Sequence, residues 1–290
     1  MKKNSLECEL EIQLKYPYVK GMISRLLSFC FTALLLATNG AFAKSPGELL
    51  DLHVLTGWQN ANGTHTAALR IILHDGWKTY WRAPGEAGIP PRFDWLSSEN
   101  LAAVEVSWPT PKLISTNGAR AIGYERSVTL PLTLTPDKKG QSITLSGQID
   151  LGICKEICVP VTVTFSQKLP MGISKRDPRI VAALAERPYS AAEGGVTRVA
   201  CRISPIEGGL RLTAEIDLPS VGGSEAAIVE TDNPDIWVSQ PKTTREGKRF
   251  TAEAELFHAN GSAFALNRSG LRITVLGQSH AVDIQGCPSG

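Results

Sequence analysis

The chain has 290 residues, of which 30 are basic and 28 acidic, and its formal net charge is +2. This length exceeds that of a typical single domain and leaves room for two hydrophobic cores. Because the charges are balanced and no basic stripe is interleaved with aromatic residues, nucleic acid and anionic lipid are excluded as expected partners, and proteins or small molecules are favoured.

Residues 1–43 have the pattern of a secretory signal peptide. Arg25 precedes an apolar run that ends in the small-x-small sequence Ala41-Phe42-Ala43. Polar residues interrupt this run within the roughly 20 residues that a membrane-spanning helix needs, so cleavage after Ala43 is favoured over a retained anchor. The residues before Met22 carry mixed charge and favour a misassigned start over a long n-region of the signal peptide. We therefore expect an exported protein whose mature chain does not insert into the membrane; the family resemblance described below places it in the periplasm.

Residues 48–168 have the pattern of an all-β domain. Short runs with period-two alternation, such as HTAALRIIL at 65–73 and SVTLPLTL at 127–134, are separated by Gly, Pro and Asn. This pattern predicts a β sandwich. Pro131 and Pro160 are expected at strand edges or bulges, because proline cannot donate a hydrogen bond to a ladder.

Residues 169–196 interrupt the β pattern and predict a linker. A short helix is expected with Asp177 as its N-cap, Pro178 at its first position and Pro188 beyond its end. The sequence SAAEGG follows as a tether. From 197 to 290 the alternation resumes and predicts a second, smaller β sandwich.

Four cysteines remain after residues 1–43: Cys154, Cys158, Cys201 and Cys287. An even number in an exported protein indicates an oxidising compartment and two bridges. Cys201 and Cys287 bracket the second domain, and closing that loop contributes about 4.6 kcal/mol in the chain-entropy model, against about 2 kcal/mol for the loop from Cys154 to Cys158. We predict a structural disulfide between Cys201 and Cys287.

The close pair, Cys154 and Cys158, favours thiol-disulfide exchange, in which one thiolate attacks a disulfide and a neighbouring cysteine resolves the product. A structural turn disulfide and a metal clamp are the two alternatives. Lys155 would lower a thiol pKa by its charge, and Glu156 would partly offset that effect.

Neither a metal site nor a hydrolytic site is indicated, and no cofactor is expected. The histidines lack ligand spacing, and two glutamates alternate along one predicted strand as on a solvated face. These residues are His53, His65, His74, His258, His280, Glu253 and Glu255.

Residues 74–95, HDGWKTYWRAPGEAGIPPRFDW, concentrate aromatic residues among prolines and glycines. Their composition favours a core and loop scaffold over a wall that shields a sulfur or a platform for sugar stacking. Together with GYERSVTLPL at 123–132 and LGICKEICVP at 151–160, however, this segment resembles the N-terminal periplasmic domain of the DsbD thiol:disulfide interchange family and its ScsB-type relatives. The resemblance covers residues 48–168.

The resemblance implies an immunoglobulin-like sandwich whose cysteine pair cycles between dithiol and disulfide. It assigns mixed-disulfide formation to Cys158 and resolution to Cys154, with Trp77, Tyr80 and Tyr124 as aromatic residues around the pair. The expected fold is thus all-β, with two immunoglobulin-like sandwiches joined by a short helical linker. The second sandwich resembles the extra domain of ScsB-like proteins, and a binding or spacing role is expected for it.

The resemblance also implies partners. Family members usually continue into a multi-helix membrane domain and a thioredoxin-like domain, neither of which follows here, so a separately encoded membrane thiol transporter and thioredoxin-like donor are expected, with oxidised periplasmic proteins as acceptors. The expected activity is that of a protein-disulfide reductase. The competing hypotheses are a copper-binding or copper-tolerance module that uses the same thiols, and a non-catalytic binding module with a turn disulfide.

Overall fold

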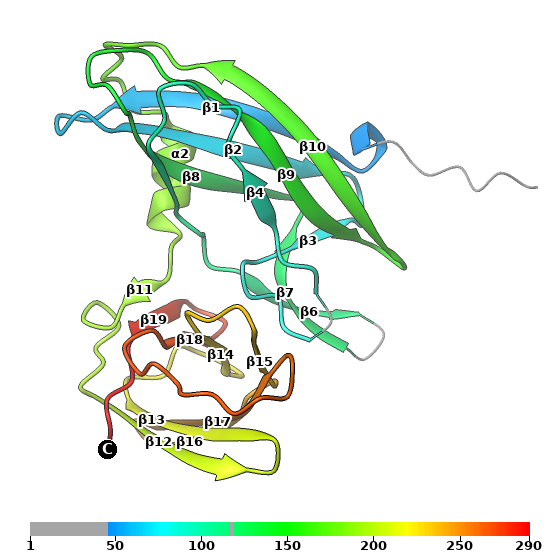
Figure 1. The fold of residues 1–290 in the computed structure, drawn as a ribbon, viewed down its shortest axis with the longest axis vertical. Helices are drawn as coiled ribbons and strands as arrows, with labels where there is room; N and C mark the ends of the chain where they lie inside the picture. The colour runs from blue at the N-terminus through cyan, green and yellow to red at the C-terminus, as the bar shows by residue number, and fades with distance from the viewer. Residues whose placement is uncertain (1–45, 87, 117–118) are drawn as a thin grey trace, which may run out of the picture. The chain divides into compact units, whose positions relative to one another are not determined.

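The computed structural model describes residues 46–86, 88–116 and 119–290 (Figure 1). The predicted signal peptide, residues 1–43, lies outside the described residues. Within the described ranges, no helix is both long and apolar enough to cross a bilayer.

Two sheets form the N-terminal sandwich, which is preceded by the 3-10 helix η1 (Pro46–Glu48). The first sheet has the strand order β1-β2-β8-β5, with neighbours antiparallel. Its strands are β1 (Leu50–Gln59), β2 (His65–Leu73), β8 (Ser127–Thr135) and β5 (Ala103–Val106). The second has the order β10-β9-β3-β7-β6, and β4 also pairs with β9. Its strands are β3 (Lys78–Tyr80), β4 (Arg92–Asp94), β6 (Lys112–Thr116), β7 (Ala119–Glu125), β9 (Thr144–Cys154) and β10 (Cys158–Lys168).

Alternating positions on these strands supply the first core. In β8, Val128, Leu130, Leu132 and Leu134 are buried, whereas Thr129 between them points to the other face and is half-buried. Burying each such aliphatic side chain stabilises the fold by about 1.5–3 kcal/mol. The period-two pattern in the sequence therefore gives the strands and their buried face correctly.

The positions of Pro131 and Pro160 show that the alternation pattern does not predict which strands lie at the edge of a sheet. Pro160 lies on β10, an edge strand, as expected. Pro131 lies instead in β8, between β2 and β5, so its expected edge position was wrong. It is tolerated because the ladder with β5 runs only from Val106 to Ala103, and the Pro131 carbonyl accepts from Ser107 N (2.8 Å) beyond the end of β5. The nitrogen of Pro131 points to the same side as its carbonyl, toward the chain beyond the end of β5. The absence of an N–H there therefore removes no hydrogen bond from the β5–β8 ladder.

Helix α2 (Pro178–Ala185) follows the first sandwich and has the predicted cap. The Asp177 carboxylate accepts from Arg179 N (2.9 Å), and Pro178 stands in the first turn. Ile180 is fully buried against Leu55, Trp58 and Ala68, which lie on the face of the β1-β2-β8 sheet opposite to the core. The helix is thus packed onto the first sandwich through its apolar side.

Two further sheets form the C-terminal sandwich, and their orders are β11-β19-β18-β14 and β12-β13-β17-β15, with β16 also on β17. The strands are β11 (Tyr189–Ser190), β12 (Arg198–Ile206), β13 (Gly209–Asp217), β14 (Ala226–Glu230), β15 (Ile236–Val238), β16 (Lys242–Glu246), β17 (Arg249–His258), β18 (Arg272–Leu276) and β19 (Ala281–Gln285). Leu212, Ile216, Phe250, Ile273 and Val275 are almost fully buried between these sheets. The predicted all-β fold of two sandwiches with a short helix between them is confirmed.

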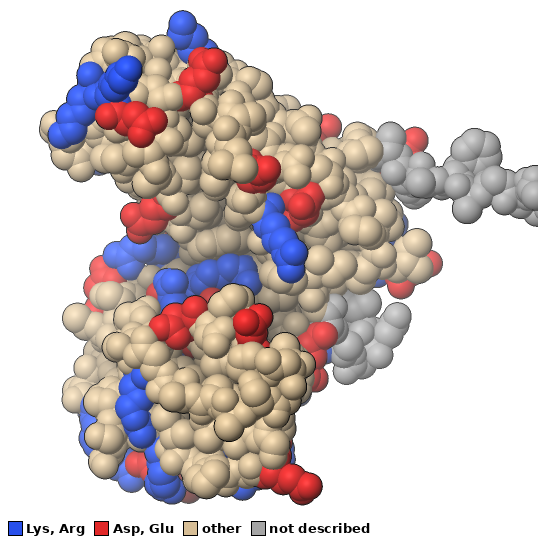
Figure 2. All heavy atoms as spheres, in the orientation of Figure 1, with Lys and Arg blue, Asp and Glu red and all other residues tan. Residues whose placement is uncertain are grey.

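Basic and acidic side chains are interspersed over the face of the protein shown in Figure 2, and uncharged surface separates most of them. This arrangement agrees with the nearly balanced charge of the sequence.

Candidate redox site

Cys154 and Cys158 close the β9–β10 hairpin, whose turn lies at the right of Figure 1. They are a directly opposed pair in the antiparallel register and are joined by a disulfide, with 4.1 Å between their Cα atoms. A short Cα separation is typical of opposed residues that do not exchange backbone hydrogen bonds. Lys155 N donates to Ile157 O (3.1 Å) across the three-residue turn. The hairpin therefore holds both sulfurs at its tip.

The two cysteines differ in exposure. Cys154 is 4% exposed, whereas Cys158 is exposed at the first position of β10. Ile157, beside Cys158, is 70% exposed. Cys158 is therefore accessible to an incoming sulfur, whereas Cys154 is not.

The hydroxyl of Tyr80 contacts both sulfurs. It donates to Cys154 Sγ at 2.9 Å and lies 3.3 Å from Cys158 Sγ. Burial raises the pKa of the Tyr80 phenol above its ordinary value, so the phenol keeps its proton at neutral pH and acts as a donor. The same O–H is placed to stabilise a thiolate when the disulfide opens.

A glycine makes room for Tyr80. A Cβ atom on Gly152 would lie 3.0 Å from Cδ2 of the Tyr80 ring and 2.6 Å from Cβ of Ile89. Ala121 of β7, another small residue, forms a buried cluster with Tyr80 and Cys154. The ring therefore packs closely against β9 at Gly152, and this packing helps to fix where its hydroxyl points.

Sequence reasoning missed Lys78, which pairs with Cys154 in the register between β3 and β9. Residues two apart on a strand share a face, so Lys78 shares the face of Tyr80. That rule, applied to the sequence WKTY, was the signal that could have found it. Lys155, the cation that the sequence suggested, instead donates to the carbonyl of Asp75 (3.3 Å) in the turn between β2 and β3.

The other two predicted aromatic residues are buried in the core of the first sandwich. Tyr124 is buried, its hydroxyl donates to the Pro109 carbonyl (2.7 Å), and burial raises its pKa well above the ordinary value. Trp77 packs in the main core of the first sandwich with Ile153. Of the three aromatic residues expected around the pair, the structure places Tyr80 against the sulfurs.

A second disulfide joins Cys201 and Cys287, which are 86 positions apart and only 2% and 1% exposed. Cys201 N donates to the Pro288 carbonyl (2.8 Å), and Arg268 donates to the Cys201 carbonyl (3.0 Å). The bond thereby ties strand β12 to the segment that follows β19.

The structure groups no three His, Cys, Asp or Glu side chains in a way that could hold a metal ion, among the residues that it describes. His65 Nε2 lies 2.6 Å from the Thr56 carbonyl, and burial lowers the pKa of this imidazole. His74 lies 3.5 Å from Asp51. These two histidines have local structural partners.

The fold is shared with a solved structure. The N-terminal periplasmic domain of ScsB from Proteus mirabilis superposes with a TM-score of 0.61 at 19% sequence identity, over 86% of this chain and 97% of that one. A protein of unknown function from Porphyromonas gingivalis W83 aligns over 81% of this chain and 99% of that one at 12% identity, but its TM-score of 0.20 carries no inference about the fold. No curated protein sequence matches the chain.

The sequence of the first sandwich matches a family directly. Residues 52–170 match the family described as "Thiol:disulfide interchange protein DsbD, N-terminal". This range contains the cysteine hairpin and Tyr80, and the match confirms the resemblance seen in the sequence. Over these residues, which are less than half of the chain, the protein is similar to the N-terminal domain of the DsbD thiol:disulfide interchange proteins.

Proposed function

We propose that this protein is a thiol-disulfide oxidoreductase that passes reducing equivalents to oxidised proteins through Cys154 and Cys158. The observation that carries the proposal is the pairing of an exposed Cys158 with a buried Cys154, with one tyrosine hydroxyl against both sulfurs. A disulfide that served only to hold a turn would need neither the difference in exposure nor the hydroxyl.

The reaction follows from the geometry. In the dithiol form, the Cys158 thiolate attacks one sulfur of an acceptor disulfide, forms a mixed disulfide and releases the other acceptor sulfur as a thiolate, which takes up a proton. The Cys154 thiolate then attacks Cys158 Sγ, the second acceptor thiolate leaves, and the Cys154–Cys158 disulfide forms. Two electrons pass to the acceptor, and a dithiol donor restores the pair by the reverse sequence of attacks.

The neighbouring side chains assist these steps. The phenol of Tyr80 donates to whichever sulfur carries negative charge, because it already lies within 3.3 Å of both. Lys78, on the same strand face, adds a positive charge that favours the thiolate form. Both effects lower the thiol pKa and increase the fraction of reactive thiolate.

We place this activity in the periplasm, reached through cleavage of residues 1–43. The proposed donor is a thioredoxin-like protein that a membrane thiol transporter keeps reduced, and the proposed acceptors are oxidised periplasmic proteins. Exchange between proteins needs an accessible sulfur, and Cys158 supplies one.

We also propose the division of labour along the chain. Residues 48–168 carry the redox chemistry, residues 169–196 link the two sandwiches, and residues 197–290 form a binding or spacing module. The buried bond between Cys201 and Cys287 is the structural staple of that second module.

Trapping tests the proposal. The Cys154→Ser variant, mixed with a thioredoxin-like module that lacks its own resolving cysteine, is expected to accumulate a mixed disulfide through Cys158, read by non-reducing electrophoresis and peptide mass spectrometry. Cys158→Ser is the matched control and is expected to give almost none, because Cys154 is buried. Equal trapping by both variants, or trapping by neither, contradicts the proposal.

A further inference from the structure

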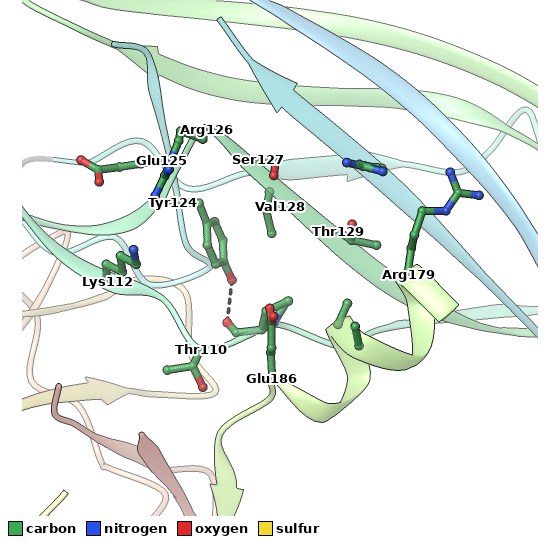
Figure 3. Close-up of a pocket in the computed structure, with 14 residues that line it drawn as sticks. Thr110, Lys112, Tyr124, Glu125, Arg126, Ser127, Val128, Thr129, Arg179 and Glu186 are labelled. Carbon is green, nitrogen blue, oxygen red and sulfur yellow. Dashed lines mark hydrogen bonds between the residues drawn. The ribbon is translucent and has the colours of Figure 1, made fainter. Parts of the chain in front are cut away.

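A second concave site lies on the first sandwich, on the outer face of the β1-β2-β8 sheet. Helix α2 covers the apolar part of this face, where Leu55, Trp58 and Ala68 lie under Ile180. The uncovered part continues along the same face to Arg70 on β2 and to Thr129, its partner in the β2–β8 register. A cavity of about 530 Å³ opens there, between the sheet, the helix and the segment around Pro109 (Figure 3). This volume lies in the range of small-molecule sites.

The cavity is rich in cations that lack acidic partners. Arg70, Lys112 and Arg126 line it, and among the described residues none of these side chains makes a hydrogen bond or an ion pair. Arg70 is half-buried on β2, which lies between β1 and β8, and a guanidinium in this position loses part of its hydration. A half-buried charge is normally paired, so the unpaired Arg70 leaves room for an anionic ligand, and the exposed Lys112 and Arg126 add positive charge at the rim.

The backbone at Arg126 gives an independent indication. Its φ is +66°, in the left-handed region that glycine and asparagine tolerate and arginine rarely adopts. The turn is held by a hydrogen bond from Leu73 N to the Arg126 carbonyl (2.7 Å). A strained position that keeps a large cationic side chain, rather than glycine, indicates a use for that side chain.

The remaining lining supplies hydroxyls and a boundary. Thr110, Ser127 and Thr129 line this space, and the hydroxyls of Ser127 and Thr129 can donate to an oxyanion. Thr110 N donates to the Glu186 carbonyl (2.7 Å), which ties the end of α2 to the opposite wall.

Two carboxylates and one paired cation set the limits of the site. In Figure 3 Glu125 points away from the cavity, whereas Glu186 borders it. Arg179, on the helix, is already paired with Asp177 (2.6 Å). The negative charge of Glu186 therefore repels a bound anion. A long polyanion would be repelled by both Glu125 and Glu186.

We propose that this cavity, which we call the arginine groove, binds a small molecule carrying a phosphate or carboxylate group, with Arg70 and Arg126 as its main contacts. Nothing in the redox chemistry at Cys154 and Cys158 requires this site, and its test is independent of the proposed oxidoreductase activity.

Binding of inorganic phosphate and of succinate to the full mature chain tests the proposal, measured by calorimetry at constant ionic strength with sodium chloride as the reference salt. Saturable binding of either probe above the chloride response is expected, and the tighter probe identifies the preferred group. Arg70→Gln and Arg126→Asn are each expected to weaken that binding at least about tenfold, with asparagine chosen because it keeps the left-handed backbone.

Two variants separate the site from general charge effects. Glu186→Gln is expected to tighten binding about threefold, because it removes an opposing charge. Arg92→Gln, an exposed arginine on β4 outside the groove, is expected to leave the affinity unchanged. Binding no different from chloride, or affinity unaffected by Arg70→Gln in a variant that keeps its circular dichroism spectrum, overturns the proposal.

Discussion

The two disulfides contain the same bond in opposite surroundings. Cys154 and Cys158 span a three-residue turn, with one partner exposed and a tyrosine hydroxyl against both sulfurs. Cys201 and Cys287 span 86 positions, are both almost fully buried and are flanked by backbone hydrogen bonds. The long loop offers stabilisation and no access, and the short loop offers access and little stabilisation. This difference teaches that access and neighbouring donors, rather than the bond itself, separate a reactive disulfide from a structural one.

The largest expected effect is on exchange. Cys158→Ser is expected to reduce disulfide exchange with a dithiol donor to the rate seen without the protein, since the exposed sulfur that partners reach is gone. The Cys201→Ala/Cys287→Ala double variant, assayed at a temperature where it stays folded, is expected to keep the wild-type rate. Stopped-flow measurement of donor oxidation compares the two variants. Loss of exchange in the double variant alone would mean that Cys201–Cys287 is the reactive disulfide and Cys154–Cys158 the structural one.

The next effect is on stability, where removing the Cys201–Cys287 bond is expected to have the larger effect of the two disulfides. Removing the Cys201–Cys287 bond is expected to lower the free energy of unfolding by about 4.6 kcal/mol, against about 2 kcal/mol for Cys154→Ala/Cys158→Ala. Urea unfolding of both double variants, followed by fluorescence, gives the two values. Equal losses would mean that loop length does not distinguish the pairs.

A smaller effect concerns the Tyr80 hydroxyl. Tyr80→Phe removes a hydrogen bond to the thiolate, of a kind that contributes about 1.5–3 kcal/mol, and one pKa unit corresponds to about 1.4 kcal/mol. Because Cys158 is exposed, we expect the low end, a rise of about one unit in the pKa of the reactive thiol. The pH profile of iodoacetamide alkylation measures it.

Tyr124→Phe is the matched control for Tyr80→Phe. Its hydroxyl donates to the Pro109 carbonyl, so it is expected to cost about 1 kcal/mol of stability without moving the thiol pKa. An equal shift in thiol pKa in both variants would show that the contact between Tyr80 and the sulfurs has no special effect.

The smallest effect is electrostatic. Lys78→Gln is expected to raise the thiol pKa by a few tenths of a unit, because pairs near the surface contribute about 0.2–1 kcal/mol. The shift should shrink as salt increases, since the Debye length is about 10 Å at 0.1 M and about 3 Å at 1 M. Lys168→Gln, at the far end of the same hairpin, is expected to leave the thiol pKa unchanged. A salt-independent shift would argue for a structural rather than an electrostatic effect.

The sequence predicted what depends on local pattern. Period-two alternation gave the strands, and Asp177 and Pro178 gave the start of the helix, because the cap and the proline act on their own turn. It did not predict what depends on which strands become neighbours. Pro131 is tolerated in an interior strand because the β5 ladder ends before it. Lys78 is opposite Cys154 because β3 pairs with β9. Such long-range register is not contained in the periodicity of either strand.

The most direct test of the proposed exchange is the reduction potential of each disulfide in the mature protein, equilibrated in glutathione or dithiothreitol buffers and read by alkylation and mass spectrometry. Exchange-active pairs lie at roughly −120 to −270 mV, and structural disulfides lie below about −300 mV. We predict a Cys154–Cys158 potential in the upper range while Cys201 and Cys287 stay bridged. Equal resistance of both pairs to reduction would contradict the proposed relay and leave a binding module held by two structural disulfides.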